Sequence, residues 1–252
     1  MSGIESRTPG PPSADLESPD TNSPAALYQA GLAHLRAGRA LDAQLCCQHA
    51  LAIDQNHADT LHLMGLICLD AQQHDHAIEW MSRAIRQQPK AEYLTSLGTA
   101  LQHQGRLEDA LKAFDKAVQL KPDVGELWRN LGNVLVDLQR PDDALLGFQH
   151  ALKLNPQLWP AAHQCAVLLY NKQRFEEALA YLDQCVEQQP NHLSSLQLRG
   201  LALKGLKRYE EALAQNQQAY AIAPNDADTS NNIGDVLQLL DRHDEALTWF
   251  DR

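Results

Sequence analysis

Apolar residues recur along most of the chain at spacings of three or four residues, which places them on one face of a helix. The clearest example has two such stretches, first Leu127, Trp128, Leu131, Leu135 and Leu138, and then Ala144, Leu145, Phe148, Ala151 and Leu152. Between them Pro141 suits the first turn of a helix. Pro156 ends the second stretch, because the residue before a proline disfavours helical backbone. The pattern predicts a hairpin of two helices.

This hairpin pattern repeats every 33 or 34 residues. A small residue on the first stretch recurs as Gly31, Gly65, Gly98, Gly132, Ala166, Gly200 and Gly234. Alanines on the second stretch keep the same intervals, at Ala43, Ala77, Ala110, Ala144, Ala178, Ala212 and Ala246. The shared period predicts seven repeats, at residues 24–57, 58–90, 91–124, 125–158, 159–192, 193–226 and 227–252, with the last incomplete.

The small residues have a packing role in this prediction. Gly132 lies on the first helix where the second must approach, and a Cβ there would hold the two helices apart. Trp128 and Phe148 are expected to fill the space around that contact as core residues. One hairpin cannot bury its apolar face alone, so neighbouring hairpins stack into a solenoid. The expected fold class is therefore all-α, without one globular core.

The repeated motif resembles the tetratricopeptide repeat (TPR). Its clearest copy reads Trp128-x2-Leu131-Gly132-x2-Leu135, followed by Ala144-x3-Phe148-x2-Ala151 and Pro156. The resemblance extends over residues 24–252 and implies a TPR solenoid, a right-handed superhelix of helix-turn-helix repeats whose first helices line a concave groove. It further implies a non-catalytic scaffold that binds an extended peptide or partner segment in that groove, without a cofactor.

The resemblance also places particular residues on the groove. In the third, fourth, fifth and seventh repeats the expected peptide-binding residues are Thr95, Thr99, Glu126, Arg129, Asn130, Asn133, Asp137, His163, Gln164, Tyr170, Asn231, Asn232 and Asp235. An asparagine amide both donates and accepts, so it can pair with both polar groups of a peptide bond. Each such bond contributes about 0.5–1.5 kcal/mol net, so a row of them is required.

Two segments resemble the asparagine ladder of the O-linked N-acetylglucosamine transferases. They read Asn130-Leu131-Gly132-Asn133 and Asn232-Ile233-Gly234-Asp235. The ladder is interrupted in other repeats by Leu63, Ser96, Gln164 and Leu198. A role in helix capping or solvation remains open for each asparagine. A clamp for a terminal carboxylate is not expected, because only Arg129 and Asn133 match its pattern.

The first two repeats have apolar groove positions, namely Tyr28, Leu32, Leu35, Leu63, Leu66 and Leu69. A wide apolar stripe does not face water without a partner. Two interpretations remain open. In one, Tyr28, Leu32, Leu63 and Leu66 form an apolar groove for a peptide, for a second copy in a homodimer, or for the leader. In the other, these side chains are core.

Both ends of the chain differ from the repeats. Residues 1–23 contain four prolines, five serines and few apolar residues, so we expect a disordered leader. The seventh repeat stops within its second helix, whereas repeat proteins need a polar terminal cap. We therefore expect the N-terminal region of a longer protein, such as a TPR-glycosyltransferase. The alternative is a free-standing TPR adaptor or assembly factor with no associated enzyme.

The charge of the chain narrows the class of partner. The formal net charge is −11, which argues against nucleic acid, because phosphates require a basic face. No run of 18 apolar residues occurs, so membrane insertion is not expected. The N-terminus also lacks the basic and apolar segments of a secretory signal. A protein or peptide partner remains.

Cysteine and histidine spacing indicates neither a disulfide framework nor a metal site. The five cysteines include no C-x-x-C pair, which favours a reducing cytoplasmic location. Cys47, Cys68, Cys165 and Cys185 occupy positions typical of core residues. His74 and His76 fall in an expected turn without a third ligand at a diagnostic spacing, so no metal is expected.

Overall fold

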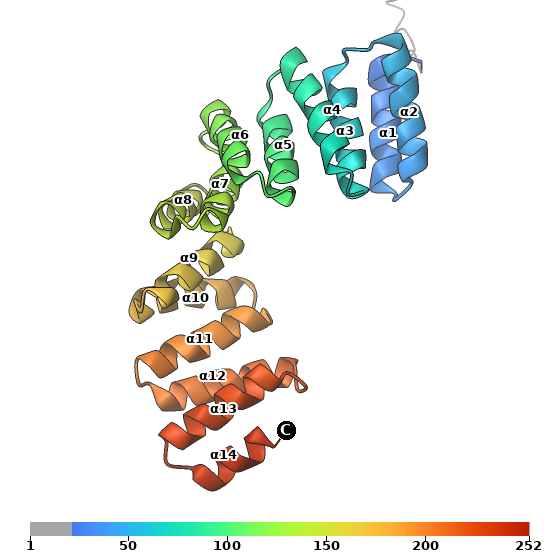
Figure 1. Ribbon diagram of the computed structural model, residues 1–252. Coiled ribbons are helices and arrows are strands. Elements are labelled where there is room, and N and C mark those ends of the chain that lie inside the picture. The colour runs from blue at the N-terminus through green and yellow to red at the C-terminus, as the bar shows by residue number, and fades with distance from the viewer. Residues whose placement is uncertain (1–21, 252) are drawn as a thin grey trace, which may run out of the picture. The chain divides into compact units, whose positions relative to one another are not determined.

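The computed structural model describes residues 22–251, and all regular secondary structure in that range is helical (Figure 1). The chain divides between Gln88 and Pro89 into two compact parts, which we call the N-block and the C-block. Each block consists of antiparallel helix pairs. The first helix of a complete pair has 13 residues and the second has 14.

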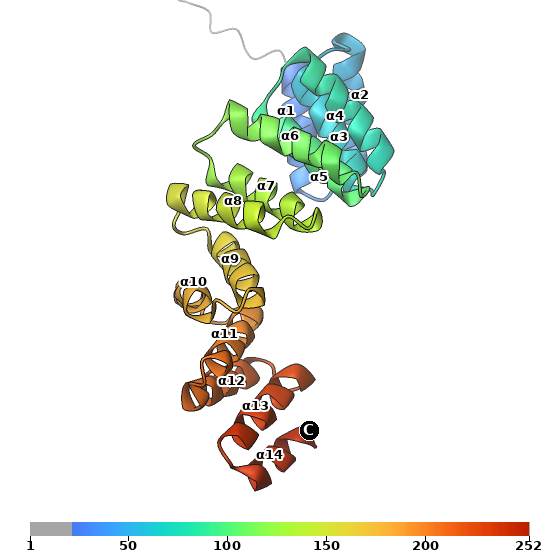
Figure 2. The ribbon, with the colours of Figure 1, turned by 60° about the vertical axis from the view of Figure 1, so that its left-hand side comes forward.

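The N-block contains two hairpins. Their helices are α1 (Pro24–Arg36), α2 (Ala40–Ile53), α3 (Ala58–Asp70) and α4 (His74–Gln87). Figure 2 shows these four helices packed beside one another. Their core contains buried Ala43, Cys47, Leu63, Met64 and Ile67.

The C-block contains five hairpins that follow one another along the chain (Figure 1). Their helices are α5 (Ala91–His103), α6 (Leu107–Leu120), α7 (Gly125–Asp137), α8 (Pro141–Leu154), α9 (Trp159–Asn171), α10 (Phe175–Gln188), α11 (Leu193–Gly205), α12 (Tyr209–Ile222), α13 (Ala227–Leu239) and α14 (His243–Phe250). Helices that pack extensively in this block are at most two helices apart in the chain. The expected all-α TPR solenoid is thus confirmed at the level of its helix pairs.

The close approach of the two helices explains the recurring glycine. A Cβ on Gly132 would lie 2.6 Å from Cε1 of Phe148, and one on Gly98 would lie 2.8 Å from Phe114. Phe148 itself is fully buried. In the hairpin that has Ala166 in place of glycine, the second helix presents the smaller Leu182. The size of the side chain on the second helix therefore matches the space that the small residue on the first helix leaves.

Trp128, which was predicted to be a core residue, lies at the edge of its hairpin. Its side chain is only half-buried, and its Nε1 donates a hydrogen bond to the Pro122 carbonyl oxygen at 2.8 Å. Its ring packs on the imidazole of His150, with centroids 4.1 Å apart. Trp128 therefore covers the edge of the hairpin, whereas Phe148 fills its interior.

The turn inside each hairpin uses one left-handed residue at the same position of every repeat. The set consists of Gly38, Gln72, Gly105, Gln139, Gln173, Lys207 and Asp241, with φ between 57° and 73°. In the fourth hairpin the backbone N–H groups of Gln139 and Arg140 donate to Val136 and Leu135. These bonds satisfy carbonyls at the end of the first helix.

The sixth hairpin has a polar interior. Asn216 occupies the position of Phe148 and is 1% exposed, and its Nδ2 donates to the Asn232 carbonyl oxygen at 3.3 Å. Its Oδ1 is buried without a hydrogen-bond partner. The adjacent Gln215, also buried, accepts a hydrogen bond from Arg199, whose Nε lies 2.8 Å from Asp183. A buried unpaired acceptor costs stability, so this hairpin is weaker inside than the fourth.

The cysteines predicted as core residues are buried. Cys47, Cys165 and Cys185 have no exposed surface, and Cys68 is 8% exposed. Burial raises the pKa of the Cys47 and Cys165 thiols to about 12 and that of Cys185 to about 11. Such thiols stay protonated and are poor nucleophiles near neutral pH.

Two further expectations concern the chain's ends and membranes. The expected leader lies almost wholly outside the described residues, apart from Asn22 and Ser23, and Ser23 caps α1. Within residues 22–251, no helix combines the length and apolar character needed to cross a lipid bilayer.

Candidate peptide-binding site

The residues predicted for the peptide groove lie on the first helices of the C-block. Thr95 and Thr99 belong to α5, and others follow on α7, α9 and α13. None of these predicted residues is buried. We call their surface the first-helix face. It divides into side chains that already have partners in the chain and side chains that do not.

The threonines and two of the aspartates have partners. The hydroxyl groups of Thr95 and Thr99 donate to backbone carbonyl oxygens one turn earlier, at 2.8 and 3.1 Å. Asp137 accepts a hydrogen bond from Gln102 of the preceding hairpin. Asp235 accepts one from Lys204 at 3.0 Å. The two aspartates thus connect the first helices of successive hairpins.

His163 and Tyr170 on α9 also have partners. The Nδ1 atom of His163 lies 3.0 Å from the hydroxyl oxygen of Ser195, which also lies 2.7 Å from Nδ1 of His192. Burial, with a smaller effect from His192, lowers the pKa of His163 and so favours the neutral imidazole. The Tyr170 ring packs on Phe175. Both side chains help to hold neighbouring helices together.

Five amide side chains on the same face have no partner in residues 22–251. They are Asn130, Asn133, Gln164, Asn231 and Asn232. Beside them on α7, the buried Nε atom of Arg129 also lacks a hydrogen-bond partner. The five amides reach solvent and bond to no other side chain of the described residues, so they can pair with an external ligand without breaking a bond of the chain.

A hollow of about 320 Å³ lies between α5 and α7 on this face. Its lining includes Ala91, Val124 and Leu127 together with Glu92, Lys121, Glu126, Thr95 and Asn130. The Lys121 ammonium lies 2.5 Å from Glu92, and this hydrogen bond lowers the pKa of the Glu92 carboxyl. Within the described residues, the Glu126 carboxylate accepts one long hydrogen bond, at 3.4 Å, from the Asn155 amide.

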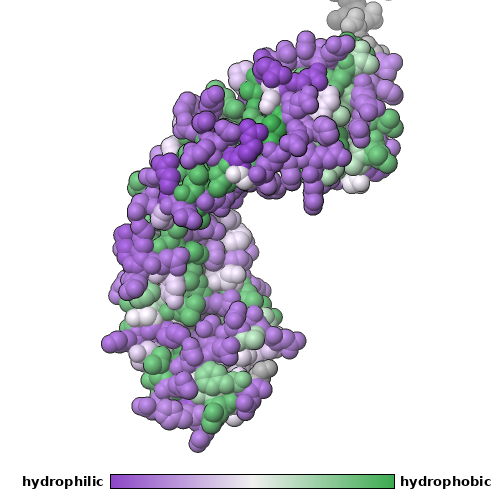
Figure 3. All heavy atoms as spheres, viewed as in Figure 1, coloured by the Kyte–Doolittle hydropathy of each residue, from purple (hydrophilic) through white to green (hydrophobic). Residues whose placement is uncertain are grey.

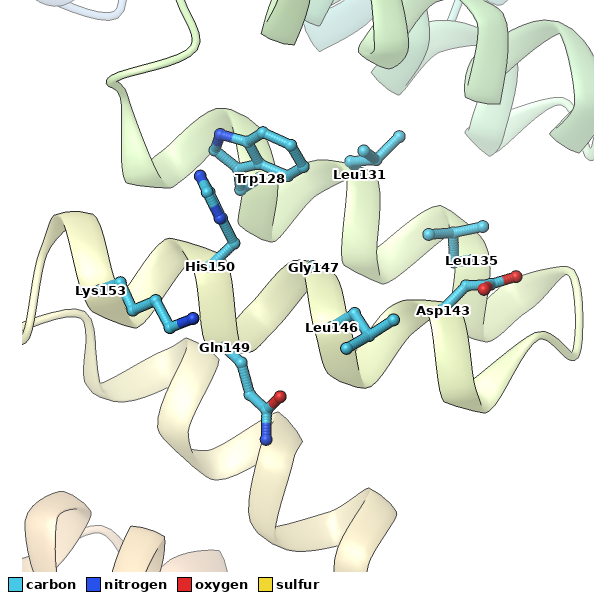
Figure 4. Close-up of a pocket in the computed structure, with 9 residues that line it drawn as sticks. All are labelled: Trp128, Leu131, Leu135, Asp143, Leu146, Gly147, Gln149, His150 and Lys153. Atoms are coloured by element: carbon cyan, nitrogen blue, oxygen red, sulfur yellow. The ribbon is translucent and has the colours of Figure 1, made fainter.

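A second hollow of about 310 Å³ lies where α7 meets α8 (Figure 4). Trp128, Leu131 and Leu135 come from α7, and Leu146 projects from α8 with 65% of its surface exposed. In Figure 3, apolar side chains interrupt the hydrophilic surface of the C-block. The repeat pattern assigns Trp128 to the core and therefore does not predict this hollow.

In the N-block, the structure separates Leu63 from the rest of the predicted apolar groove. Leu63 is 1% exposed and belongs to the core. Its Cδ2 would lie 3.2 Å from a Cβ on Gly31. Leu63 therefore lies within the core of the N-block. Tyr28, Leu32 and Leu66 are half-buried around that core, and their role in a groove stays a prediction.

No cluster of three or more histidine, cysteine or acidic side chains in residues 22–251 is arranged to hold a metal ion. His74 and His76 lie in the first turn of α4, not in the turn before it. Asn216 is a buried polar residue that was not predicted. The signal was present, because Asn216 stands four residues after Ala212 as Phe148 does after Ala144.

Stacked hairpins with a small residue at each helix contact define an all-helical repeat protein. The tetratricopeptide repeat model matches residues 28–92, 95–158 and 166–227. The chain therefore belongs to the tetratricopeptide repeat family.

Solved structures of similar proteins have the same fold. PilF of Pseudomonas aeruginosa is 25% identical, with a TM-score of 0.74 over 82% of this chain and 94% of that one. YrrB, described as a TPR protein with an unusual peptide-binding site, is 23% identical, with a TM-score of 0.62 over 73% of this chain and 95% of that one.

Two curated relatives match shorter segments. Superkiller protein 3 of Saccharomyces cerevisiae is 39% identical over 61 residues, which are 24% of this chain and 4% of the relative. Protein O-mannosyl-transferase TMTC1 of Homo sapiens is 26% identical over 98 residues, which are 37% of this chain and 11% of the relative. The matches thus span a small part of either relative.

Proposed function

We propose that this chain is a non-catalytic interaction scaffold whose C-block binds an extended peptide segment along the first-helix face. The observation that carries this proposal is the set of amides without partners, Asn130, Asn133, Gln164, Asn231 and Asn232. An amide can donate to a peptide carbonyl and accept from a peptide N–H, so these side chains suit an extended backbone.

The partnered residues of the face have a different role in this proposal. Thr95, Thr99, Asp137, His163 and Asp235 already bond within the chain. A ligand would have to share these atoms with the bonds that they already make. We assign these residues to shaping the face, and the free amides with Arg129 to contacting the ligand. The peptide-binding site named in the description of YrrB supports a peptide as the ligand class.

A displayed library of random 12-residue peptides, selected on the complete chain, tests this function. The double variant Asn130→Ala with Asn133→Ala should bind synthetic peptides of the selected sequence about tenfold more weakly, because it loses two amide contacts. The matched control is Asn191→Ala with Gln217→Ala, which removes two exposed amides outside the face. Fluorescence anisotropy measures the affinity, and circular dichroism checks the fold. Equal affinity for both double variants would contradict the proposed site.

For a longer protein that contains this chain, we propose that the hairpins present bound segments to an enzyme such as a glycosyltransferase. The similarity to a segment of an O-mannosyl-transferase supports this idea. The alternative is an adaptor or assembly factor without an enzyme. The reading frame after Arg252 discriminates between them, since a glycosyltransferase domain supports the first and a stop codon after one polar helix supports the second.

We further propose a cytoplasmic location, supported by the cysteines, all of which are free thiols in the structure. Fractionation of cells that produce the full-length protein tests it. A homodimer remains a proposal for the half-buried N-block residues Tyr28, Leu32 and Leu66. Sedimentation velocity of the complete chain tests that oligomeric state.

A further inference from the structure

We propose that the hollow between α5 and α7 receives a lysine or arginine side chain of the bound segment. This inference rests on the proposed peptide-binding function and adds the chemical class of one ligand residue. It depends on the shape of the hollow, on its charges and on its position beside a free amide.

The floor of the hollow is apolar. Ala91 is 2% exposed and Leu127 is 8% exposed, and half-buried Val124 completes the floor at the start of α7. The volume of about 320 Å³ is enough for one long side chain. Lysine and arginine bury their methylene stems on apolar surface of this kind while the charged group stays at the rim.

The rim carries an excess of negative charge. Glu92 and Glu126 both line the hollow, and Lys121 is the one cation among its lining residues. The Lys121 ammonium is occupied by Glu92 at 2.5 Å. Glu126 is exposed, and the hydrogen bond that it accepts from Asn155 is long at 3.4 Å. The Glu126 carboxylate can therefore accept a hydrogen bond from a ligand cation without breaking a strong bond of the chain.

Asn130 connects the hollow to the proposed peptide site. It lines the hollow and is also one of the amides without a partner in residues 22–251. A peptide whose backbone pairs with Asn130 thus passes beside the opening, and one of its side chains can enter. A neutral apolar side chain would fill the floor but leave Glu126 unpaired. An acidic side chain would face two carboxylates and be repelled.

The test begins with displayed 12-residue peptides enriched on the complete wild-type chain and depleted on the Asn130→Ala, Asn133→Ala variant. We expect lysine or arginine at one fixed position. Synthetic peptides then carry lysine, norleucine or glutamate there. Replacing lysine by norleucine, which keeps the stem and removes the charge, should weaken wild-type binding about threefold to tenfold.

Variants of Glu126 test whether its carboxylate causes the preference for the lysine peptide. In Glu126→Gln the lysine and norleucine peptides should bind equally, and in Glu126→Lys the glutamate peptide should be preferred. The matched control is Glu108→Gln, which removes an exposed carboxylate on α6 outside the hollow and should keep the lysine preference. Raising the salt concentration should reduce the preference in wild type but not in Glu126→Gln.

The outcomes separate the two proposals. Selected peptides that depend on Asn130 and Asn133 but show no preference for a cation would overturn this inference and leave the peptide-binding function standing. If the norleucine peptide binds the wild-type chain more tightly than the lysine peptide does, the inference is also overturned, because the hollow would then accept an apolar side chain. If no displayed peptide is enriched, both proposals fail.

Discussion

The fourth and sixth hairpins share the same repeat pattern but differ in their interiors and surfaces. In α7–α8, Gly132 admits the fully buried ring of Phe148. In α11–α12, Gly200 faces Asn216, whose Oδ1 has no partner. On the first-helix face, Asn130 and Asn133 of α7 have no partner in residues 22–251, whereas Gln197 and Lys204 of α11 bond to α13 and its preceding turn.

The α11 contacts show what the sixth hairpin gains from its polar side chains. Gln197 donates to Asp226 at 2.7 Å and to Thr229 at 2.9 Å, and Lys204 donates to Asp235. These bonds connect the sixth hairpin to the seventh. The fourth hairpin is thus stabilised from within and leaves Asn130 and Asn133 of its face open, whereas the sixth uses Gln197 and Lys204 for internal connections. The same repeat pattern supports both arrangements.

The largest expected difference between the two hairpins follows truncation of the central residue. Phe148→Ala should lower the free energy of unfolding by about 3–5 kcal/mol, because it leaves a large apolar cavity. Asn216→Ala should change it by less than about 1 kcal/mol, because the lost 3.3 Å hydrogen bond is offset by removal of an unpaired buried acceptor. Urea unfolding of the complete chain measures both. Equal losses would show that the polar interior stabilises as strongly as the aromatic one.

Helix capping provides a smaller difference that depends on pH. Asp226 caps α13 through the Thr229 N–H at 2.8 Å, whereas Val124 at the start of α7 provides no side-chain cap. Asp226→Ala should therefore cost about 1 kcal/mol at pH 7. Hydrogen bonds from Thr229, and then Gln197, lower the pKa of Asp226.

The sign of the pH effect follows from that lowered pKa. The stabilisation is complete above the unfolded-state pKa, about 3.9, and is lost as the pH falls through the lower folded-state value. The stability difference between wild type and Asp226→Ala should accordingly shrink in acid. Urea unfolding at pH 7 and below pH 4 checks this, with Asp123→Ala, an exposed aspartate beside Val124, as the control. A difference that is independent of pH would exclude the carboxylate as its cause.

The smallest expected effect comes from the left-handed turn residue, and it should be the same in the two hairpins. Gln139 and Lys207 adopt the same left-handed turn conformation, with φ of 57° and 61°. Gln139→Gly and Lys207→Gly should each raise the unfolding free energy by up to about 1 kcal/mol, because glycine adopts this conformation without steric cost.

The converse change provides the control for that turn effect. Gly105→Ala should destabilise by a similar amount, and no atom lies within 4 Å of its new Cβ, so packing does not contribute. Urea midpoints of the three variants measure the effect. A loss of stability in Gln139→Gly would show that its side chain matters more than its backbone.

The repeat period predicted most of the fold because each hairpin uses the same local rules. Residues such as Gly132 and Phe148 show their partnership in the spacing alone, and helix ends follow from prolines such as Pro156. The left-handed turn residue was not predicted, because four of the seven repeats have glutamine or lysine at that position, and neither residue carries a strong turn signal. The half-exposed position of Trp128 depends on its contact with His150, which the repeat pattern does not encode.

The site was predicted only as a list of positions on one face. Counting along each first helix identified Asn130 and Asp137 equally well, but Asp137 bonds to Gln102 of another hairpin and Asn130 has no partner in the described chain. Such pairings depend on how adjacent hairpins rotate against each other. The hollow also includes Lys121, which lies in the connection between two hairpins. Lys121 forms an ion pair with Glu92, which is 29 residues away in the sequence.

The restriction of packing to helices close in sequence also affects how the C-block folds. A contact between α7 and α8 closes a short loop, so its entropic cost is small, and no step must wait for distant parts of the chain. Proteins of this kind have low contact order and fold quickly. Folding can start in any favourable hairpin and spread to its neighbours, and the aromatic fourth hairpin is a better nucleus than the polar sixth.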